Sequence, residues 1–117
     1  MQISFVGSTD VTSKDGGAWV VAAAESAALL PAAVRLDKAS GGALTRALKF
    51  SRFTGKTGQF LEVLAPAGLK ASRLLLVGVG KPESLDEKGL ETLGAQIVGR
   101  LFAAGEAAAS IDRKSVV

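Results

Sequence analysis

The hydrophobic positions of this chain follow two periods, and these periods predict its secondary structure. Alternating apolar and polar residues predict a strand over 2–6. Continuous apolar runs predict two strands covered on both faces, at 19–23 and 73–79, and the second is typical of a central strand. Shorter apolar runs predict further strands at 60–64 and 107–111.

A first amphipathic helix is predicted to begin at a cap, either Asp37 or Ser40, and to run to about Phe50. Its apolar positions recur at i, i+1, i+4 and i+5 and form one stripe. The stripe consists of Ala43, Leu44, Ala47 and Leu48. The segment 25–35 stays open at this stage, because Pro31 argues against one continuous helix there.

A second, longer helix is predicted to start at a Ser-x-x-Glu capping box formed by Ser84 and Glu87, and to end at Gly105. Its apolar residues predict a face that packs on the core. These residues are Leu90, Leu93, Ile97 and Leu101, flanked by Val98 and Phe102. Gly94 and Gly99 weaken a helix interior, and close packing against the sheet would account for them.

Strands that alternate with helices predict an α/β fold with a sheet between helices. The length of 117 residues fits one small domain, residues 1–117. With 48% hydrophobic and 21% charged residues, the composition is that of a folded protein. The chain has no Cys and no His, which excludes disulfides, Ser-His-Asp and Cys-His catalysis, and thiolate or imidazole metal ligands. A metal would need carboxylates and carbonyls.

The formal net charge of +3 is a small excess of basic residues. Four of them lie close together in the sequence, at Arg46, Lys49, Arg52 and Lys56. We favour a solvated surface for this group, and a site for a nucleic-acid backbone is the alternative. The apolar run 18–34 is interrupted well short of a membrane span, and no secretory signal is visible, so a cytoplasmic protein is expected.

The stretch Gly55-Lys56-Thr57 has the ending of a phosphate-binding loop, but it fails two tests. Such a loop needs a glycine five positions earlier, where this chain has Phe50. It should also follow a strand, whereas this stretch follows a predicted helix. We therefore do not interpret it as a nucleotide site.

A second glycine motif, Gly78-Val79-Gly80, stands between a predicted strand and the long helix. A dinucleotide fingerprint would place its third glycine at position 83, which is Glu83. We favour a tight strand-to-helix turn. The alternative is an anion site that uses free N–H groups of this loop.

Three carboxylates, Asp86, Glu87 and Glu91, fall on the first turns of the long helix. A pair on one face can hold a metal or share a proton. We favour the simpler interpretation, in which acidic side chains stabilise the positive end of the helix.

The order of several segments resembles the N-terminal domain of the leucyl aminopeptidases, also called cytosol aminopeptidases. The segments are LDKASGGALTRALK at 36–49, FTGKTGQ at 53–59, RLLLVGVGK at 73–81 and the helix that follows. The resemblance extends from about residue 3 to 110. It implies a macro-domain-like mixed sheet flanked by helices. It also implies that FTGKTGQ connects a helix to a strand, with glycines for unusual backbone angles, Phe53 in the core and no chemistry for Lys56.

Members of this family remove N-terminal residues from peptides with two divalent metal ions, zinc or manganese, bound in a separate C-terminal domain. The family signature Asn-Thr-Asp-Ala-Glu-Gly-Arg, which carries metal ligands, does not occur in this chain. The resemblance therefore implies a domain that is inactive alone. No residue of the chain is predicted to be catalytic, cofactor-binding or metal-ligating.

The implied partners are the catalytic C-terminal domain, the peptide substrate through that domain, and further copies in a homo-hexamer. The alternatives are a free-standing module that binds ADP-ribose or a nucleotide, and an accessory domain for nucleic acid. The final residues 112–117 fit the family pattern poorly, so we expect a sheet that is incomplete at the C-terminus, as in a truncated reading of a longer gene.

Overall fold

The computed structural model describes residues 2–6, 17–64, 66, 68, 71–106 and 108–112. These residues form one sheet with the strand order β1-β6-β2-β5-β4, and β3 pairs with β2 beside this path. The strands are β1 (Gln2–Val6), β2 (Ala18–Ala24), β3 (Ala28–Leu29), β4 (Phe60–Leu64), β5 (Arg73–Gly80) and β6 (Ala108–Asp112). The five predicted strands are confirmed, and only the short β3 was not foreseen.

The sheet is mixed, as predicted. Four strands run parallel to one another, in the order β1, β6, β2 and β5. Two pairs are antiparallel: β4 with β5, and β3 with β2. Because β2 lies in the middle of the order and β5 beside it, both are buried along almost their whole length. Their continuous apolar sequences follow from this position.

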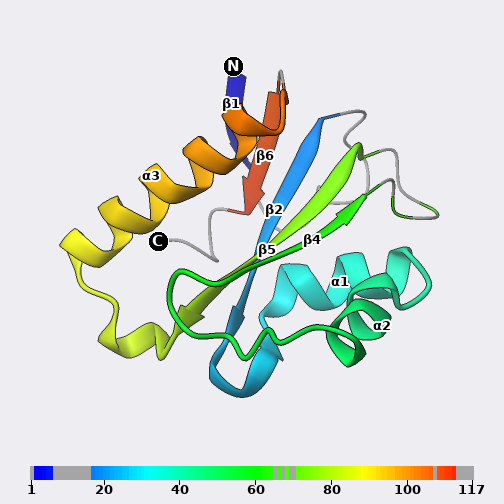
Figure 1. Ribbon diagram of the computed structural model, residues 1–117, viewed down its shortest axis with the longest axis horizontal. Coiled ribbons are helices and arrows are strands. Elements are labelled where there is room, and N and C mark those ends of the chain that lie inside the picture. The colour runs from blue at the N-terminus through cyan, green and yellow to red at the C-terminus, as the bar shows by residue number, and fades with distance from the viewer. Residues whose placement is uncertain are drawn as a thin grey trace.

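Helices cover both faces of the sheet (Figure 1). The long helix α3 (Glu87–Ala103) packs on one face, while α1 (Pro31–Ala39) and α2 (Ala43–Lys49) pack on the other. Alternate residues of β2 enter opposite cores: Trp19 and Val21 face α1 and α2, and Val20 and Ala22 face α3. The predicted α/β arrangement, a mixed sheet flanked by helices, is confirmed.

The open segment 25–35 contains a helical turn, a strand and a helix start. The turn η2 (Glu25–Ala27) leads into β3, and Pro31 then occupies the first position of α1. This position suits proline because the first N–H groups of a helix have no partner within it. Pro31 thus begins a helix.

The predicted helix through 37–50 is in fact two helices. Gly41 and Gly42 adopt positive φ angles of 69° and 86° and separate α1 from α2, so Gly42 is the N-cap residue. The predicted caps were therefore wrong in position. Both side chains nevertheless serve the start of α2, because Ser40 Oγ accepts from the Ala43 N–H at 3.4 Å and Asp37 Oδ1 accepts from the Thr45 N–H at 2.9 Å.

The predicted capping box of α3 is also wrong. Ser84 belongs to a separate turn, η3 (Pro82–Ser84), and Asp86 is the N-cap, whose carboxylate accepts from the Gly89 N–H at 2.7 Å. The other end is as predicted. Gly105 has φ of 77°, and the N–H groups of Gly105 and Glu106 donate to the carbonyls of Phe102 and Leu101, which is a Schellman ending.

The core-facing stripe of α3 is narrower than predicted. Leu93, Ile97 and Leu101 are buried, but Val98 is 42% exposed and Phe102 is 76% exposed. Gly94 and Gly99 do not pack against the sheet, because a Cβ added at either would meet nothing within 4 Å. The reason is geometric: these four residues lie on the flanks and the outer side of the helix.

Candidate functional site

The connector, residues 50–59, links α2 to β4 and crosses the end of β5 in close backbone contact. Backbone hydrogen bonds tie it to both glycines of the second motif. The Gly78 N–H donates to the Gln59 carbonyl at 2.8 Å, and the Gly80 N–H donates to the Gly55 carbonyl at 2.8 Å. The Gly58 N–H donates back to the Gly78 carbonyl at 3.1 Å.

Glycine is required here because backbones cross at van der Waals distance. A Cβ at Gly78 would overlap the Lys56 carbonyl oxygen, and a Cβ at Gly55 would overlap the carbonyl of Ala24. Gly55 and Gly58 also have positive φ angles of 87° and 90°, which other residues rarely adopt. Close packing of chain on chain therefore explains both glycine motifs.

This geometry decides how each motif can be used. Gly78 and Gly80 are the last residues of β5, so the predicted turn starts one residue later. Their N–H groups donate to carbonyls of the connector, so the alternative of an anion site with free donors is contradicted at these two positions. Thr57 lies against Gly80, with no phosphate cradle formed by Gly55-Lys56-Thr57 in the part of the chain that is described.

Gln59 organises the connector, a role that no sequence pattern indicated. Its Oε1 accepts hydrogen bonds from the Thr54 N–H at 2.9 Å, the Lys56 N–H at 3.1 Å and the Thr54 hydroxyl at 3.1 Å. The Thr54 carbonyl in turn accepts from the Ala27 N–H at 3.0 Å. One side chain thus fixes the loop that covers the end of the sheet.

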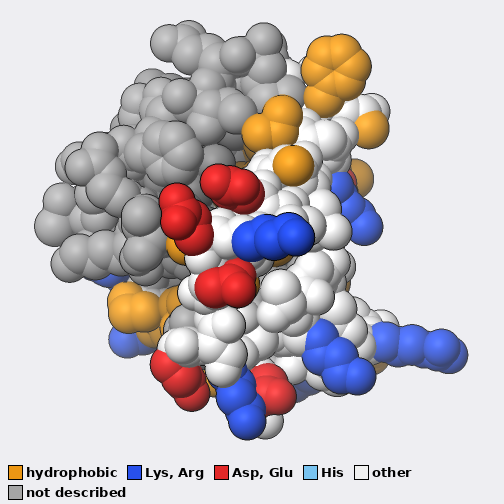
Figure 2. Space-filling view, turned by 90° about the vertical axis from the view of Figure 1, so that its left-hand side faces the viewer, with side chains coloured by type: hydrophobic (Ala, Val, Ile, Leu, Met, Phe, Trp, Pro, Cys, Tyr) orange, Lys and Arg blue, Asp and Glu red, His pale blue; other side chains and the backbone are white. Residues whose placement is uncertain are grey.

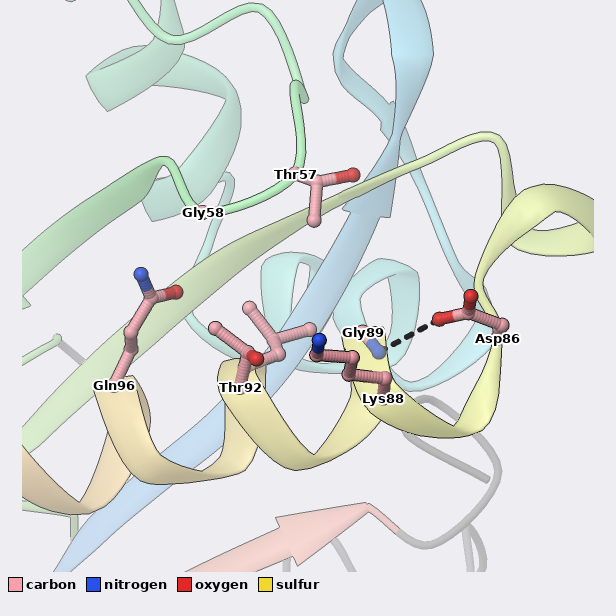
Figure 3. Close-up of a pocket in the computed structure, with 8 residues that line it drawn as sticks. Thr57, Gly58, Asp86, Lys88, Gly89, Thr92 and Gln96 are labelled. Carbon is pink, nitrogen blue, oxygen red and sulfur yellow. Dashed lines mark hydrogen bonds between the residues drawn. The ribbon is translucent and has the colours of Figure 1, made fainter.

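A hollow of about 410 Å³ lies between the connector and the first half of α3 (Figure 3). Thr57 and Gly58 form one side, and Lys88, Thr92 and Gln96 line the helix side. The Asp86 carboxylate already occupies the helix N-terminus, because it accepts from Gly89. It places a negative charge where an anionic ligand would bind.

For the carboxylates predicted at the start of the long helix, the structure agrees with the simpler interpretation, stabilisation of the helix start. Asp86 caps α3, and Glu87 and Glu91 are exposed on its first turns. Among the described residues no three Asp, Glu, His or Cys side chains come together as a metal site. The arrangement thus favours helix stabilisation over metal binding for these acids.

The four clustered basic residues are all exposed. Arg46 and Lys49 lie on α2, where the Arg46 guanidinium donates to the Gly41 carbonyl, and Arg52 and Lys56 lie on the connector. On the side where α3 lies, acidic and basic side chains are interspersed (Figure 2). The described surface on that side therefore shows no basic stripe of the kind that follows a nucleic-acid backbone.

Two further hollows continue along α3 beside β4. One, of about 290 Å³, is lined by Arg52 and Arg100, and the next, of about 540 Å³, by Arg100, Arg73 and Glu62. The Arg100 guanidinium lies 4.5 Å from the centre of the Phe60 ring. These side chains come from the connector, β4, β5 and α3, so sequence proximity did not reveal the grouping.

Arg73 is the centre of an ion-pair cluster. Its Nε donates to Glu106 Oε2 at 2.7 Å, and its Nη1 donates to Glu62. The hydrogen bond to the Glu106 carboxylate, supported by Glu62, raises the pKa of Arg73 above its ordinary value. The cluster joins β4, β5 and the segment that follows α3, and it pairs the arginine with two carboxylates.

Comparison with known proteins assigns the chain to a family. The family model described as "Cytosol aminopeptidase family, N-terminal domain" matches residues 20–115. This chain belongs to the cytosol aminopeptidase family. Its relatives include the "Probable cytosol aminopeptidase" of Caulobacter vibrioides, 42% identical over 95 residues, and that of Rhodopseudomonas palustris strain BisA53, 39% identical over 102 residues. The matches cover 81% and 87% of this chain but only 19% and 20% of those relatives.

A solved structure of a mutant tomato leucine aminopeptidase has the same fold, with a TM-score of 0.73 at 22% sequence identity. The match covers 95% of this chain and 22% of the tomato chain. This chain thus spans about a fifth of the length of the relatives that it matches. Within the described residues, no helix has the length and apolar character needed to cross a membrane.

The family resemblance also predicted the role of FTGKTGQ correctly. The segment connects α2 to β4, and its two glycines have the positive φ angles expected of them. Phe53 is 9% exposed and packs in the core with Leu44, as predicted. Lys56 is exposed, and its backbone N–H donates to Gln59 Oε1 within the connector.

Proposed function

We propose that this chain is the non-catalytic N-terminal domain of a two-metal leucyl aminopeptidase that removes N-terminal residues from peptides. The observation that carries the proposal is the extent of the match. The chain matches the family's N-terminal domain over residues 20–115 and only about a fifth of the length of each relative. The remaining four fifths is where we place the catalytic machinery.

The chemistry of the side chains supports this division. The chain has no His and no Cys, and its described carboxylates do not converge on a metal site. The residues present therefore do not fit the two divalent ions, zinc or manganese, that the family implies, and we assign no catalytic, cofactor-binding or metal-ligating residue. In the parent enzyme such ions would activate a water and polarise the scissile carbonyl.

The proposed partners follow from the same assignment. They are the catalytic C-terminal domain, the peptide substrate through that domain, and further copies in a homo-hexamer in the cytoplasm. Two observations support a structural role over a reactive one: the glycines of the connector and of β5 serve close backbone packing, and the acid at the start of α3 is a helix cap.

The test is an assay of the purified chain on leucyl-p-nitroanilide with added manganese. We expect no turnover above the blank, with the full-length Caulobacter vibrioides relative assayed in parallel as the comparison. Metal-dependent turnover by the 117-residue chain, reproduced in independent preparations, would overturn the proposal.

The alternative of a module for ADP-ribose or a nucleotide has weaker support. Its motivating loop offers no free donor at Gly78 or Gly80, and Asp86 repels phosphate at the neighbouring helix start. Calorimetry with ADP-ribose discriminates the two readings, because a saturable heat would favour the module. For a nucleic-acid accessory domain, a gel shift that weakens steeply with salt would be the favourable result.

A further inference from the structure

Three arginines line the adjoining hollows between α3 and β4, and they differ in the number of carboxylates with which each is paired. Arg73 is paired with two carboxylates, those of Glu106 and Glu62. Arg52 and Arg100 make neither an ion pair nor a side-chain hydrogen bond to any residue in the described ranges 17–64 and 71–106. The surface thus contains one arginine paired with carboxylates and, next to it, two arginines that line a hollow of about 290 Å³.

Arg100 is held in position without using its donors. Its guanidinium lies 4.5 Å from the centre of the Phe60 ring, and Phe60 itself is packed against the core beneath α3. A cation over an aromatic face is attracted by the ring electrons, and its N–H groups remain available as hydrogen-bond donors. Because the side chain is already oriented, less conformational entropy is lost when a ligand binds to it.

The lining of this hollow fits one kind of ligand. Two guanidinium groups match the oxygens of a carboxylate, to which arginine binds in a planar, bidentate manner. The remaining lining includes Ser51, Gln59 and the apolar side chains of Phe53 and Leu61. A volume of about 290 Å³ suits a side chain with its neighbouring atoms better than a large cofactor.

The flanking hollows carry charges of both signs. The hollow adjoins the one lined by Asp86 and Lys88 through the shared residue Gly58, and it adjoins the one lined by Glu62 and Arg73 through Arg100. Because Arg73 is already paired with Glu62, a phosphate backbone meets no continuous row of available cations along these hollows, whereas a single carboxylate needs only the two arginines.

We propose that the pocket between Arg52 and Arg100 is a receptor for an Asp or Glu side chain on a protein segment. Its source, which rests on the proposed function, is the part of the aminopeptidase polypeptide that lies outside this chain. Relatives carry about four fifths of their length beyond the match, and β4, beside the pocket, has no strand on its outer side among the described residues. A segment of that polypeptide can therefore reach the pocket along the sheet edge.

The binding chemistry is tested on the full chain by NMR titration with two capped peptides, Ala-Ala-Glu-Ala-Ala and Ala-Ala-Gln-Ala-Ala. We expect the Glu peptide to shift the Leu61 amide and the Arg100 side-chain N–H in the millimolar range, and the Gln peptide to leave both in place. Arg100→Gln and Arg52→Gln should each weaken binding about tenfold, the effect of losing one charge-assisted contact. Lys49→Gln removes an exposed cation outside the pocket and should change nothing.

Equal shifts with both peptides, or an unchanged affinity in Arg100→Gln, would overturn the carboxylate site. A decamer of thymidine that shifts the same signals more strongly than the Glu peptide would also overturn it, in favour of nucleic acid. Thermal unfolding of each variant shows that a lost signal is not a lost fold, because all three substituted side chains are exposed.

The source of the carboxylate needs the longer protein. In a hybrid in which this chain replaces the matching fifth of the Caulobacter vibrioides relative, Arg100→Gln should lower the Tm by roughly 2 °C. In the lone chain the same substitution removes only the contact with Phe60, so it should lower the unfolding free energy by less than in the hybrid, and an equal loss in both would overturn this source. These readouts are independent of peptidase activity, so an active lone chain would refute the proposed function and leave the titration intact.

Discussion

The Gly80 N–H donates a 2.8 Å hydrogen bond to the Gly55 carbonyl, and this bond joins the two glycine motifs that the sequence presents separately. Each motif contains some of the residues that are typical of a phosphate-binding loop. In the fold they bind each other, because the connector lies directly on the end of β5. Two motifs that suggest nucleotide chemistry thus hold the connector against the end of β5.

The crossing of these backbones predicts a severe effect of a methyl group at Gly78. Gly78→Ala places a Cβ against the Lys56 carbonyl oxygen, so the connector must move, and we expect a loss of about 1–3 kcal/mol of unfolding free energy. Gly94→Ala is the matched control, since its Cβ meets nothing within 4 Å. It should stabilise α3 by about 0.5–1 kcal/mol. Urea unfolding of both variants measures this, and equal stabilities would contradict the crossing.

Gln59 is predicted to hold the connector through its single carbonyl oxygen. Gln59→Ala removes the acceptor for the Thr54 and Lys56 N–H groups, which are near solvent and can turn to water. We therefore expect a modest loss of about 1 kcal/mol and faster hydrogen exchange at these two amides. Gln96→Ala, a glutamine with no such contacts in the described chain, is the control. Unchanged exchange at both amides would argue against the role given to Gln59.

The start of α3 distinguishes two candidate caps. Asp86→Ala removes the acceptor of the Gly89 N–H and should cost about 1 kcal/mol, whereas Ser84→Ala should cost almost nothing. Equilibrium unfolding in urea compares the two. A larger loss for Ser84→Ala would restore the capping box that the sequence suggested.

The central strands could be predicted because burial on both faces requires a continuous apolar sequence. Every residue of β2 from Ala18 to Ala23 is apolar and buried. The cap of α3 could not, because Ser84 and Asp86 are both good capping residues, and the choice depends on the turn through Pro82–Ser84. Local sequence indicates which residues can cap a helix. It does not indicate where the preceding chain arrives.

The candidate site was less predictable than the fold. Glycines in the connector indicate unusual backbone angles, but their neighbours are distant in sequence. Gly55 lies against the Ala24 carbonyl at the end of β2, and Gly58 lies near Gln96 of α3. Arg73, Arg100 and Phe60 come from three different elements, and nothing in their own neighbourhoods marks them as a group. Contacts between residues distant in sequence decide this surface, and periodicity does not report them.

The final prediction concerns the Arg73 cluster. Arg73→Met leaves the carboxylates of Glu106 and Glu62 without their cation, and the Glu106 side chain is only 9% exposed. The raised pKa of Arg73 means that its pairing is fully present at neutral pH and, on the alkaline side, is lost only as the pH rises through this raised value. We expect Arg73→Met to lower the unfolding free energy at pH 7 by about 1–3 kcal/mol, reduced for the exposed Glu62 pair. Urea unfolding at pH 7 checks this, with Lys49→Met as a cation outside the cluster, which should cost almost nothing. A loss for Arg73→Met no larger than that for Lys49→Met would contradict the stabilising role given to the two ion pairs.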